Sequence, residues 1–541
     1  MAPKILIFYG TFISLPQTTT QDKSAKHAFL IRRGALTVSP ATGRILSSDW
    51  TVDSESALQS FIAANNWSPS EVQLTIARES HNEFFFPGFI DTHIHAPQYP
   101  NSGLFGSSTL LNWLETYTFP LESSMGDLDK AHTVYSKVID RTLANGTTFA
   151  SYFATTHVAA TNLLATLAFT KGQRALIGRV CMDNSSFCPE YYKDESAEDS
   201  LHKTQETITH IQTLDPAGQL VKPIITPRFA PTCTPTSLSN LGTLAKSYTP
   251  PLHIQTHISE NIDEVALVQD LFPESSSYAD VYDQHNLLTE KTILAHAVHL
   301  TPAEKTLIAE RKSKIAHCPA SNSALGSGLA PVRDLLDHGI TVGLGTDVSG
   351  GYSCGVLEAV RGGCLVSRLL RHSKSAVASQ GASDGKKEEE EGREVLSVEE
   401  SLYLATRGGA AVVGMEEELG GFEEGMFWDV QMVRLGGDVS ASVGSKSQTP
   451  AESGKSTVDI FGWESWTEKV HKWVWTGDDR NVSKVWVRGR LVHELQESAG
   501  SGTWSETVLG GVSRKGWVGY VLAGVGVATL GAFLGRRGRA F

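Results

Sequence analysis

The 541-residue sequence is poor in positive charge relative to negative charge. Lys and Arg number 46 against 59 Asp and Glu, which gives a formal net charge of −13 at pH 7. A surface that binds nucleic acid usually carries excess positive charge, because it must attract phosphates. The balance therefore argues against DNA or RNA as a partner and leaves a small-molecule substrate open.

Cysteines are also few, and their pattern excludes a disulfide scaffold. The six cysteines form no Cys-x-x-Cys pair, and a chain of this length builds a core without disulfide staples. The apolar run at the N-terminus, Ile5 to Tyr9, is too short for a secretory signal. We expect reduced thiols and a cytoplasmic location for the folded part.

Long apolar runs are missing until the C-terminus. Residues 516–535 carry no charge, and basic residues flank them on both sides. About 20 apolar residues can just cross a bilayer. One interpretation is a transmembrane tail anchor that leaves the protein facing the cytosol from an organelle surface. The other is a glycine-rich tail that packs on the folded part or stays loose.

Two kinds of strand pattern divide the rest of the chain. Alternating runs near both ends predict a small β-sandwich domain built from residues 1–86 and 416–500. Residues 87–415 instead repeat short apolar runs with helical stretches between them, which predicts an α/β fold, a (β/α)8 TIM-type barrel. Polar stretches at 372–393 and 436–457 are expected to be disordered insertions, and 501–541 forms the tail.

The expected strands lie at defined places. Those of the small domain are Lys4–Leu15, Ala35–Val52, Asp429–Arg434 and Val485–Val492; those of the barrel are Gly88–His93, Thr147–Ala150, Ala175–Arg179, Pro223–Arg228, His253–His257, Thr292–His296, Lys314–Cys318 and Ile340–Asp347.

A His-x-His pair ends the first barrel run. His93 and His95 are two residues apart, so on a strand their side chains point to the same side and can converge on one metal ion. The carboxyl ends of barrel strands are where barrel enzymes place their sites. A single His-x-His pair is also common in protein cores, where both side chains are hydrogen-bonded and bind no metal.

Side chains that can bind a metal or transfer a proton also end three later runs, which favours a functional site. His257, His296 and Asp347 each end a predicted strand. Buried histidine and aspartate need partners, so core strands seldom end on them by chance.

This set of residues resembles the amidohydrolase superfamily, in the branch that holds one metal ion. The resemblance implies that His93, His95, His257 and Asp347 bind the metal and that His296 lies beside the metal and its water. Two-metal members carry a bridging lysine after strand 4, which the stretch Pro223–Phe229 lacks. We therefore expect a single ion, zinc rather than iron, although a His/Asp site accepts either.

Further motifs resemble the guanine deaminase family within that superfamily. They are His95-Ala-Pro-Gln98-Tyr-Pro-Asn, Leu111-Asn-Trp-Leu-Glu-Thr-Tyr-Thr-Phe-Pro-Leu-Glu122, Val180-Cys-Met-Asp-Asn184, Thr226-Pro-Arg228-Phe229-Ala-Pro, His257-Ile-Ser-Glu260-Asn and Cys318-Pro-Ala-Ser-Asn-Ser. The resemblance spans about Lys4 to Val492. It implies hydrolysis of guanine to xanthine and ammonia in purine metabolism, and a homodimer.

The resemblance also implies roles in catalysis. Asp347 would take a proton from the metal's water, Glu260 would protonate a ring nitrogen, and His296 would orient the water.

Four residues are expected to contact the purine. The planar guanidinium of Arg228 suits the purine acceptors O6 and N7. Gln98 would hydrogen-bond another edge of the purine, and His257 would lie near the substrate. Phe229 is either a substrate contact or a packed aromatic.

The sequence leaves one alternative function open and argues against two others. Another aminohydrolase, acting on a triazine, a pterin or an adenosine derivative, is the nearest alternative. A non-catalytic scaffold of the same fold is disfavoured because such relatives lose the ligand histidines. The His81-x-Glu83 pair resembles half of the cytidine deaminase zinc signature, but no Pro-Cys-x-x-Cys follows it.

Overall fold

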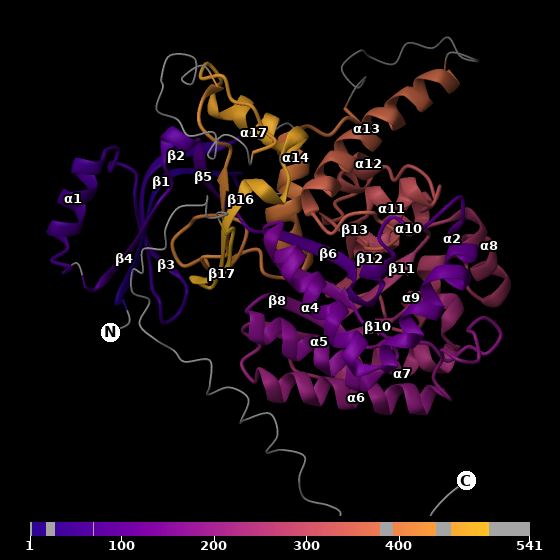
Figure 1. The fold of residues 1–541 in the computed structure, drawn as a ribbon. Helices are drawn as coiled ribbons and strands as arrows, with labels where there is room; N and C mark the ends of the chain where they lie inside the picture. The colour runs from indigo at the N-terminus through magenta and orange to yellow at the C-terminus, as the bar shows by residue number, and fades with distance from the viewer. Residues whose placement is uncertain (1–2, 18–27, 69, 379–392, 440–455, 497–541) are drawn as a thin grey trace, which may run out of the picture. The chain divides into compact units, whose positions relative to one another are not determined.

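The described part of the chain contains a nearly closed barrel of eight parallel strands (Figure 1). The structure is a computed structural model, and it describes residues 3–17, 28–68, 70–378, 393–439 and 456–496. The predicted (β/α)8 fold is confirmed. In the order of their pairing, the barrel strands are β14 (Val342–Leu344), β13 (Lys314–His317), β12 (Thr292–His296), β11 (His253–Ile258), β10 (Val221–Pro227), β8 (Arg174–Gly178), β7 (Thr147–Phe153) and β6 (Phe89–His95), and β9 (Val180–Cys181) pairs with β10 off this path.

Hydrogen bonds join the first and last barrel strands. The hydroxyl of Thr92 donates to the carbonyl of Leu344 at 2.9 Å, and the backbone N–H of Asp347 donates to the carbonyl of His93 at 2.8 Å. These contacts bring Asp347 next to the His-x-His pair although more than half of the barrel sequence separates them.

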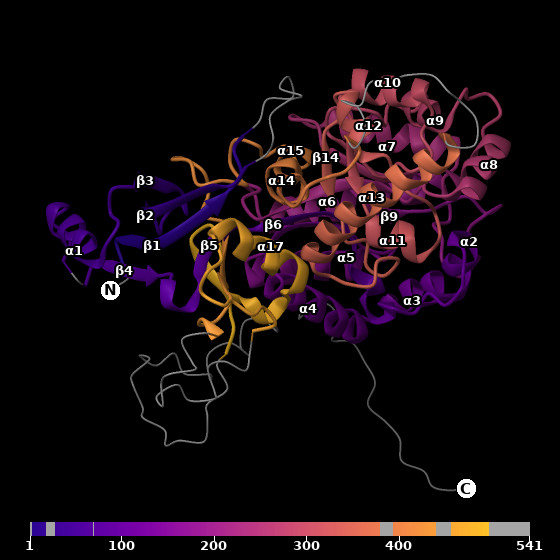
Figure 2. The ribbon, with the colours of Figure 1, turned by 90° about the horizontal axis from the view of Figure 1, so that it is seen from above.

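Helices cover the outside of the barrel (Figure 2). Local sequence sets their ends: α10 begins at a capping box of Thr301 and Glu304, and α5 ends at Gly172, whose φ of +87° suits glycine. The helices within and around the barrel are α2 (Leu110–Trp113), α3 (Phe119–Ser123), α4 (Leu128–Ala144), α5 (Val158–Lys171), α6 (Ala197–Leu214), α7 (Pro235–Ser247), α8 (Ile262–Leu271), α9 (Tyr278–Gln284), α10 (Pro302–Glu310), α11 (Pro319–Ala324), α12 (Val332–Asp337), α13 (Val356–Ala378), α14 (Val398–Tyr403) and α15 (Gly409–Val412).

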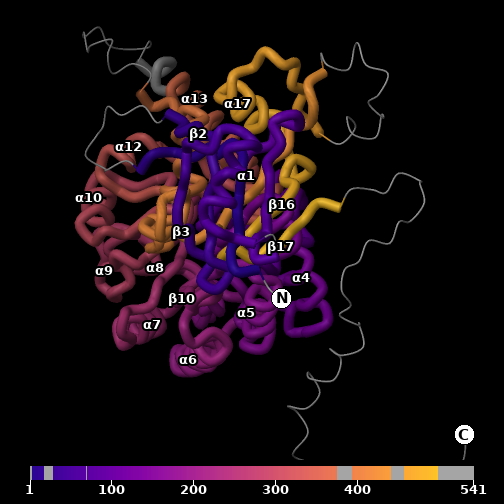
Figure 3. Tube along the Cα trace, turned by 90° about the vertical axis from the view of Figure 1, so that its left-hand side faces the viewer, coloured from indigo at the N-terminus to yellow at the C-terminus, as the bar shows by residue number. Residues whose placement is uncertain are grey.

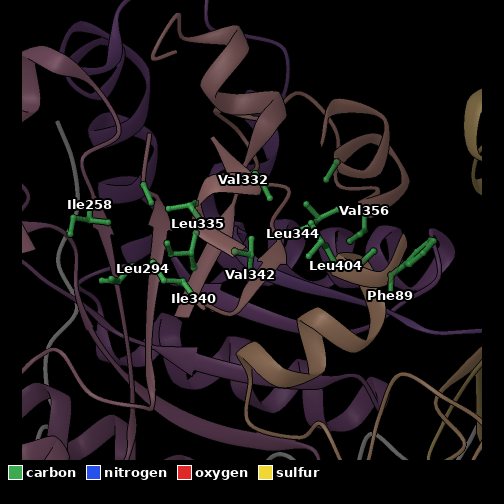
Figure 4. Close-up of a cluster of buried hydrophobic side chains, with 14 of the residues drawn as sticks. Phe89, Ile258, Leu294, Val332, Leu335, Ile340, Val342, Leu344, Val356 and Leu404 are labelled. Carbon is green, nitrogen blue, oxygen red and sulfur yellow. The ribbon is translucent and has the colours of Figure 1, made fainter. Parts of the chain in front are cut away.

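Apolar side chains fill the layer between the strands and these helices. Figure 4 shows part of it, where Leu294 of β12 and Leu344 of β14 share a cluster with Leu335 of α12 and Val356 of α13. All four are buried. Burying such a side chain contributes about 1.5–3 kcal/mol, so this layer holds the strand ends, and the residues that follow them, in place.

Strands from both ends of the chain form one mixed sheet of eight strands, which confirms the predicted small β domain (Figure 3). Helices α1 (Glu55–Ala64) and α17 (Trp466–Thr476) accompany it. Its strands are β17 (Arg490–Glu494), β16 (Val482–Val487), β15 (Val430–Arg434), β5 (Glu83–Pro87), β1 (Ile5–Ser14), β2 (Leu30–Val38) and β3 (Ile45–Asp49) in pairing order, with β4 (Val72–Ile76) pairing with β1.

Strand β1 is buried at every position because both faces of the sheet are covered. Successive side chains of a strand point to opposite faces. Phe8 and Phe12 pack with Trp428 in one cluster, whereas Ile7 and Tyr9 pack with residues of α1 in another.

Two of the predicted strands are hairpins in the structure. The stretch Ala35–Val52 turns at Gly43, whose φ is +72°, and gives parts of β2 and β3. The stretch Val485–Val492 turns at Arg488 and Gly489, with φ of +50° and +73°. Two consecutive residues with positive φ are typical of the tight turns that match strand twist.

The predicted insertion 372–393 is wrong at its start, because α13 continues to Ala378. Once a helix has formed, each added residue gains a hydrogen bond at little cost, so a polar stretch can extend it. Residues 379–392 and 440–455 lie outside the described residues, as does the candidate anchor 516–535. Among the described residues, no helix is long and apolar enough to cross a membrane. The tail anchor and the homodimer stay predictions.

Candidate active site

The structure brings the predicted site residues together at the carboxyl ends of the barrel strands. His93 and His95 lie on β6, and His257 lies on β11. Asp347 is not on a strand, since β14 ends at Leu344; it follows in a loop with a φ of +48°. Left-handed backbone costs a non-glycine residue energy and is often found at functional sites.

Four of these side chains form a group that could hold a metal ion. One ligand atom from each of His93, His95, His257 and Asp347 lies within 4.8 Å of the others. Oδ1 of Asp347 lies 3.1 Å from Nε2 of His93 and 3.3 Å from Nε2 of His95. Nε2 of His95 and Nε2 of His257 are 3.2 Å apart.

The protonation of the histidines suits metal binding. Burial lowers the pKa of His93 and holds the pKa values of His95 and His257 well below the usual range, so the rings are neutral. Neutral imidazole is the form that binds metals. Nδ1 of His257 donates to the carbonyl of Arg228 at 2.6 Å, which leaves Nε2 free as a ligand.

The buried polar atoms of this group also fit an ion. Nε2 of His93 is buried and lies 3.1 Å from Oδ1 of Asp347 without the geometry of a hydrogen bond. Burial opposes ionisation of Asp347, but its contact with His93 and the positive charge of His296 outweigh burial and lower the pKa of that carboxyl. An ionised carboxylate facing neutral ring nitrogens is a suitable donor set for a divalent cation.

A second group shares His93 with the first and consists of His93, His296 and Cys318. Burial raises the pKa of the Cys318 thiol well above its usual range, and its Sγ donates to the carbonyl of Ala316. Because the thiolate is the form that binds metals, the His/Asp group is the better metal site.

Glu260 and His296 form a second functional pair beside the metal group. Nε2 of His296 lies 3.4 Å from Oε2 of Glu260 and 3.7 Å from Oδ2 of Asp347. Burial raises the pKa of Glu260 to about 7. Burial also lowers the pKa of His296, but the carboxylates of Glu260 and Asp347 outweigh it and raise that pKa. Glu260 can therefore hold or release a proton near neutral pH.

Two hydrogen bonds orient this pair. Nδ1 of His296 lies 2.8 Å from Oδ1 of Asn322, so Nδ1 carries the proton and Nε2 faces the carboxylates. The hydroxyl of Ser327 donates to Oε1 of Glu260 at 3.1 Å.

A cavity opens onto these groups. Its lining combines polar groups with apolar walls and consists of His95, Gln98, Leu110, Trp113, Leu114, Arg228, Phe229, His257, Glu260, Glu264, His296, Leu325 and Asp347.

The predicted purine-contact residues all line this cavity. Arg228 follows β10, and Gln98 lies in the short helix after β6. Phe229 is 3% exposed and packs edge-on against Phe187, with ring centroids 5.5 Å apart. It is thus a packed aromatic that also forms part of the cavity wall.

Sequence reasoning missed Glu122, although it is the last residue of a quoted motif. Glu122 is fully buried and accepts hydrogen bonds from Gln98 and from Arg228. Sequence reasoning also missed Asp91. Its carboxylate accepts a hydrogen bond from the hydroxyl of Thr346 at 2.5 Å and so supports the loop that carries Asp347. The only available signal for Asp91 was its place on the His-x-His strand.

Comparisons with known proteins agree with this geometry. Residues 84–492 match the model of the amidohydrolase family. The chain is 49% identical over 427 residues to a probable guanine deaminase of Schizosaccharomyces pombe, covering 79% of this chain and 75% of the relative. It is 38% identical to guanine deaminase of Rattus norvegicus, covering 91% and 98%.

Among solved structures, guanine deaminase from C. acetobutylicum with bound guanine in its active site is similar to this chain. The TM-score is 0.73 and the identity 30%, over 90% of this chain and 100% of that one. The chain belongs to the amidohydrolase family and, within it, to the family of the guanine deaminases.

Proposed function

We propose that the protein hydrolyses guanine to xanthine and ammonia. The observation that carries the proposal is one cavity lined both by members of the His/Asp metal group and Glu260 and by Arg228 and Gln98. The names of its relatives, and the guanine bound to one of the similar structures, support the same substrate.

We also propose that the metal is a single zinc ion held by His93, His95, His257 and Asp347. Nitrogen ligands from histidine together with one carboxylate oxygen are typical of zinc. The stretch after β10 offers Arg228 and Phe229 and no lysine that could bridge a second ion. Bound zinc would supply a water molecule activated for attack at neutral pH.

The chain's own residues would move the protons of the reaction. Asp347 would accept a proton from the attacking water, and His296 would orient that water through Nε2. Glu260, with its pKa raised by burial to about 7, would deliver a proton to a ring nitrogen. Addition of water at C2 and loss of the amine then give xanthine and ammonia.

Recognition of the purine would use the other groups that line the cavity. Arg228 would donate to O6 and N7 through its planar fork, and Gln98 would bind another edge. Phe229 and the apolar walls, including Trp113 and Leu114, would pack on the ring faces.

A substrate panel tests this assignment against the other aminohydrolases. Purified full-length protein would be incubated with guanine, isoguanine, a pterin, a triazine and adenosine, and ammonia would be measured. We expect guanine to give the highest kcat/KM and xanthine to be the product. Faster turnover of isoguanine or the pterin would contradict the substrate assignment while leaving the metal site intact.

A further inference from the structure

We propose that Glu122 is a positioning residue that holds Arg228 and Gln98 in the geometry needed to bind the purine. The proposal rests on the function proposed above. Gln98 and Arg228 each lie beyond the end of a barrel strand. A common partner would fix the distance between their side chains.

Glu122 is that partner. It lies on α3 with no exposed surface, and both oxygens of its carboxylate are occupied. Oε1 accepts from Nε2 of Gln98 at 2.7 Å, and Oε2 accepts from Nη1 of Arg228 at 2.5 Å and from the hydroxyl of Tyr192 at 2.8 Å. One buried anion thus links three segments of the chain.

These contacts also set which way the Gln98 amide faces. The backbone N–H of Ser349 donates to Oε1 of Gln98 at 3.1 Å, which requires an oxygen at that position. Glu122 requires a donor at the other position. Both neighbours therefore agree on one orientation, and the second N–H of the amide is left as a donor for an acceptor on the purine.

For Arg228, Glu122 supplies both charge balance and direction. Burial opposes the charged form of Arg228, but Glu122 outweighs it and raises the pKa of the guanidinium. The ring of Phe119 lies under the guanidinium, 5.2 Å away. With Nη1 bound to Glu122, the remaining N–H groups of the fork are held in a fixed direction, and the site carries no net charge from this pair, which suits a neutral base.

The segment that carries Glu122 also forms a wall of the cavity. Leu110, Trp113 and Leu114 line the cavity, and Glu122 follows Leu114 along the same helical segment. The same stretch of chain therefore supplies apolar surface for the ring and the anchor for the groups that bind its edges. Glu122 would therefore act in the selection of the substrate, and it does not contact the metal group.

The test compares Glu122→Gln with the wild-type full-length protein on two substrates, guanine and 2-aminopurine. Both have the amine at C2, but 2-aminopurine lacks O6. An amide offers one oxygen to three donors, so Arg228 or Gln98 loses its partner. We expect KM for guanine to rise about 10–100-fold, the range of a hydrogen bond to a charged group, with a much smaller change in kcat. The preference for guanine over 2-aminopurine should fall by a similar factor.

The matched control is Asp429→Asn. Asp429 forms another buried arginine–carboxylate pair, with Nε of Arg174 at 2.5 Å, and Arg174 begins β8, at the opposite end of the barrel strands. This variant should unfold at lower denaturant concentration yet keep KM and the substrate preference.

Three results would overturn the proposal. An unchanged KM and preference in Glu122→Gln would show that Glu122 does not position the two groups. An equal loss on both substrates, like that of a general structural defect, would reduce it to a stability role. Absence of guanine turnover in the metal-loaded wild type would overturn the proposed function itself, and with it the purine-binding role of Arg228 and Gln98.

Discussion

Replacing Glu260 with glutamine is expected to lower kcat for guanine by about 10²–10⁴-fold, the usual contribution of a general acid or base. Glutamine keeps the shape of the side chain, and its amide oxygen can still accept from Ser327, but it cannot transfer a proton. Because Glu260 is outside the His/Asp group, zinc content should stay at the wild-type level.

Steady-state kinetics and metal analysis on the same preparation check this result. KM should change little, since the proposed purine contacts are Arg228 and Gln98. A Glu260→Gln variant that keeps both its metal and a wild-type kcat would contradict the proton-transfer role. Loss of metal together with activity would point to a ligand role that the geometry does not assign to Glu260.

Replacing His257 with alanine is expected to abolish metal binding and turnover together. His257 offers Nε2 to the metal group, and its Nδ1 is already held by the carbonyl of Arg228. Losing the metal removes several kcal/mol of transition-state stabilisation, so guanine turnover should fall by about 10³-fold or more. Metal analysis and ammonia release measure the two effects.

His253 provides a matched control on the same strand. It begins β11, whereas His257 lies near its carboxyl end, and burial of its ring lowers its pKa to about 3, so it too is a neutral histidine, although it is only partly buried. His253→Ala should lower stability but retain metal and activity. If both variants lost metal equally, the loss would reflect damage to β11, and the ligand role of His257 would lack support.

The barrel could be predicted from the sequence because its strands are short apolar runs that recur with helical spacing. Thr292–His296 is a strand with the predicted bounds, and the other runs overlap β6 to β14. Hairpins were harder to predict, since β2 and β3 together look like one alternating run. Their separation depends on the turn at Gly43, a conformational signal that periodicity does not contain.

The metal group could be predicted because histidine and aspartate at strand ends stand out against apolar surroundings. Asp347 was found for this reason even though it lies past its strand, in a left-handed conformation. Glu122 could not be found in the same way. Its importance comes from contacts with Gln98 and Arg228, 24 and 106 residues away, and such pairing is visible only in the folded chain.

The central claim is that one metal ion in the His/Asp group drives guanine deamination. The most direct test measures ammonia release from guanine by purified full-length protein, first as isolated, then after chelation, and then after zinc is returned. We predict that turnover disappears on chelation and returns as zinc content approaches about one ion per chain. Undiminished turnover by metal-free protein, or no guanine turnover by zinc-loaded protein, would contradict the account.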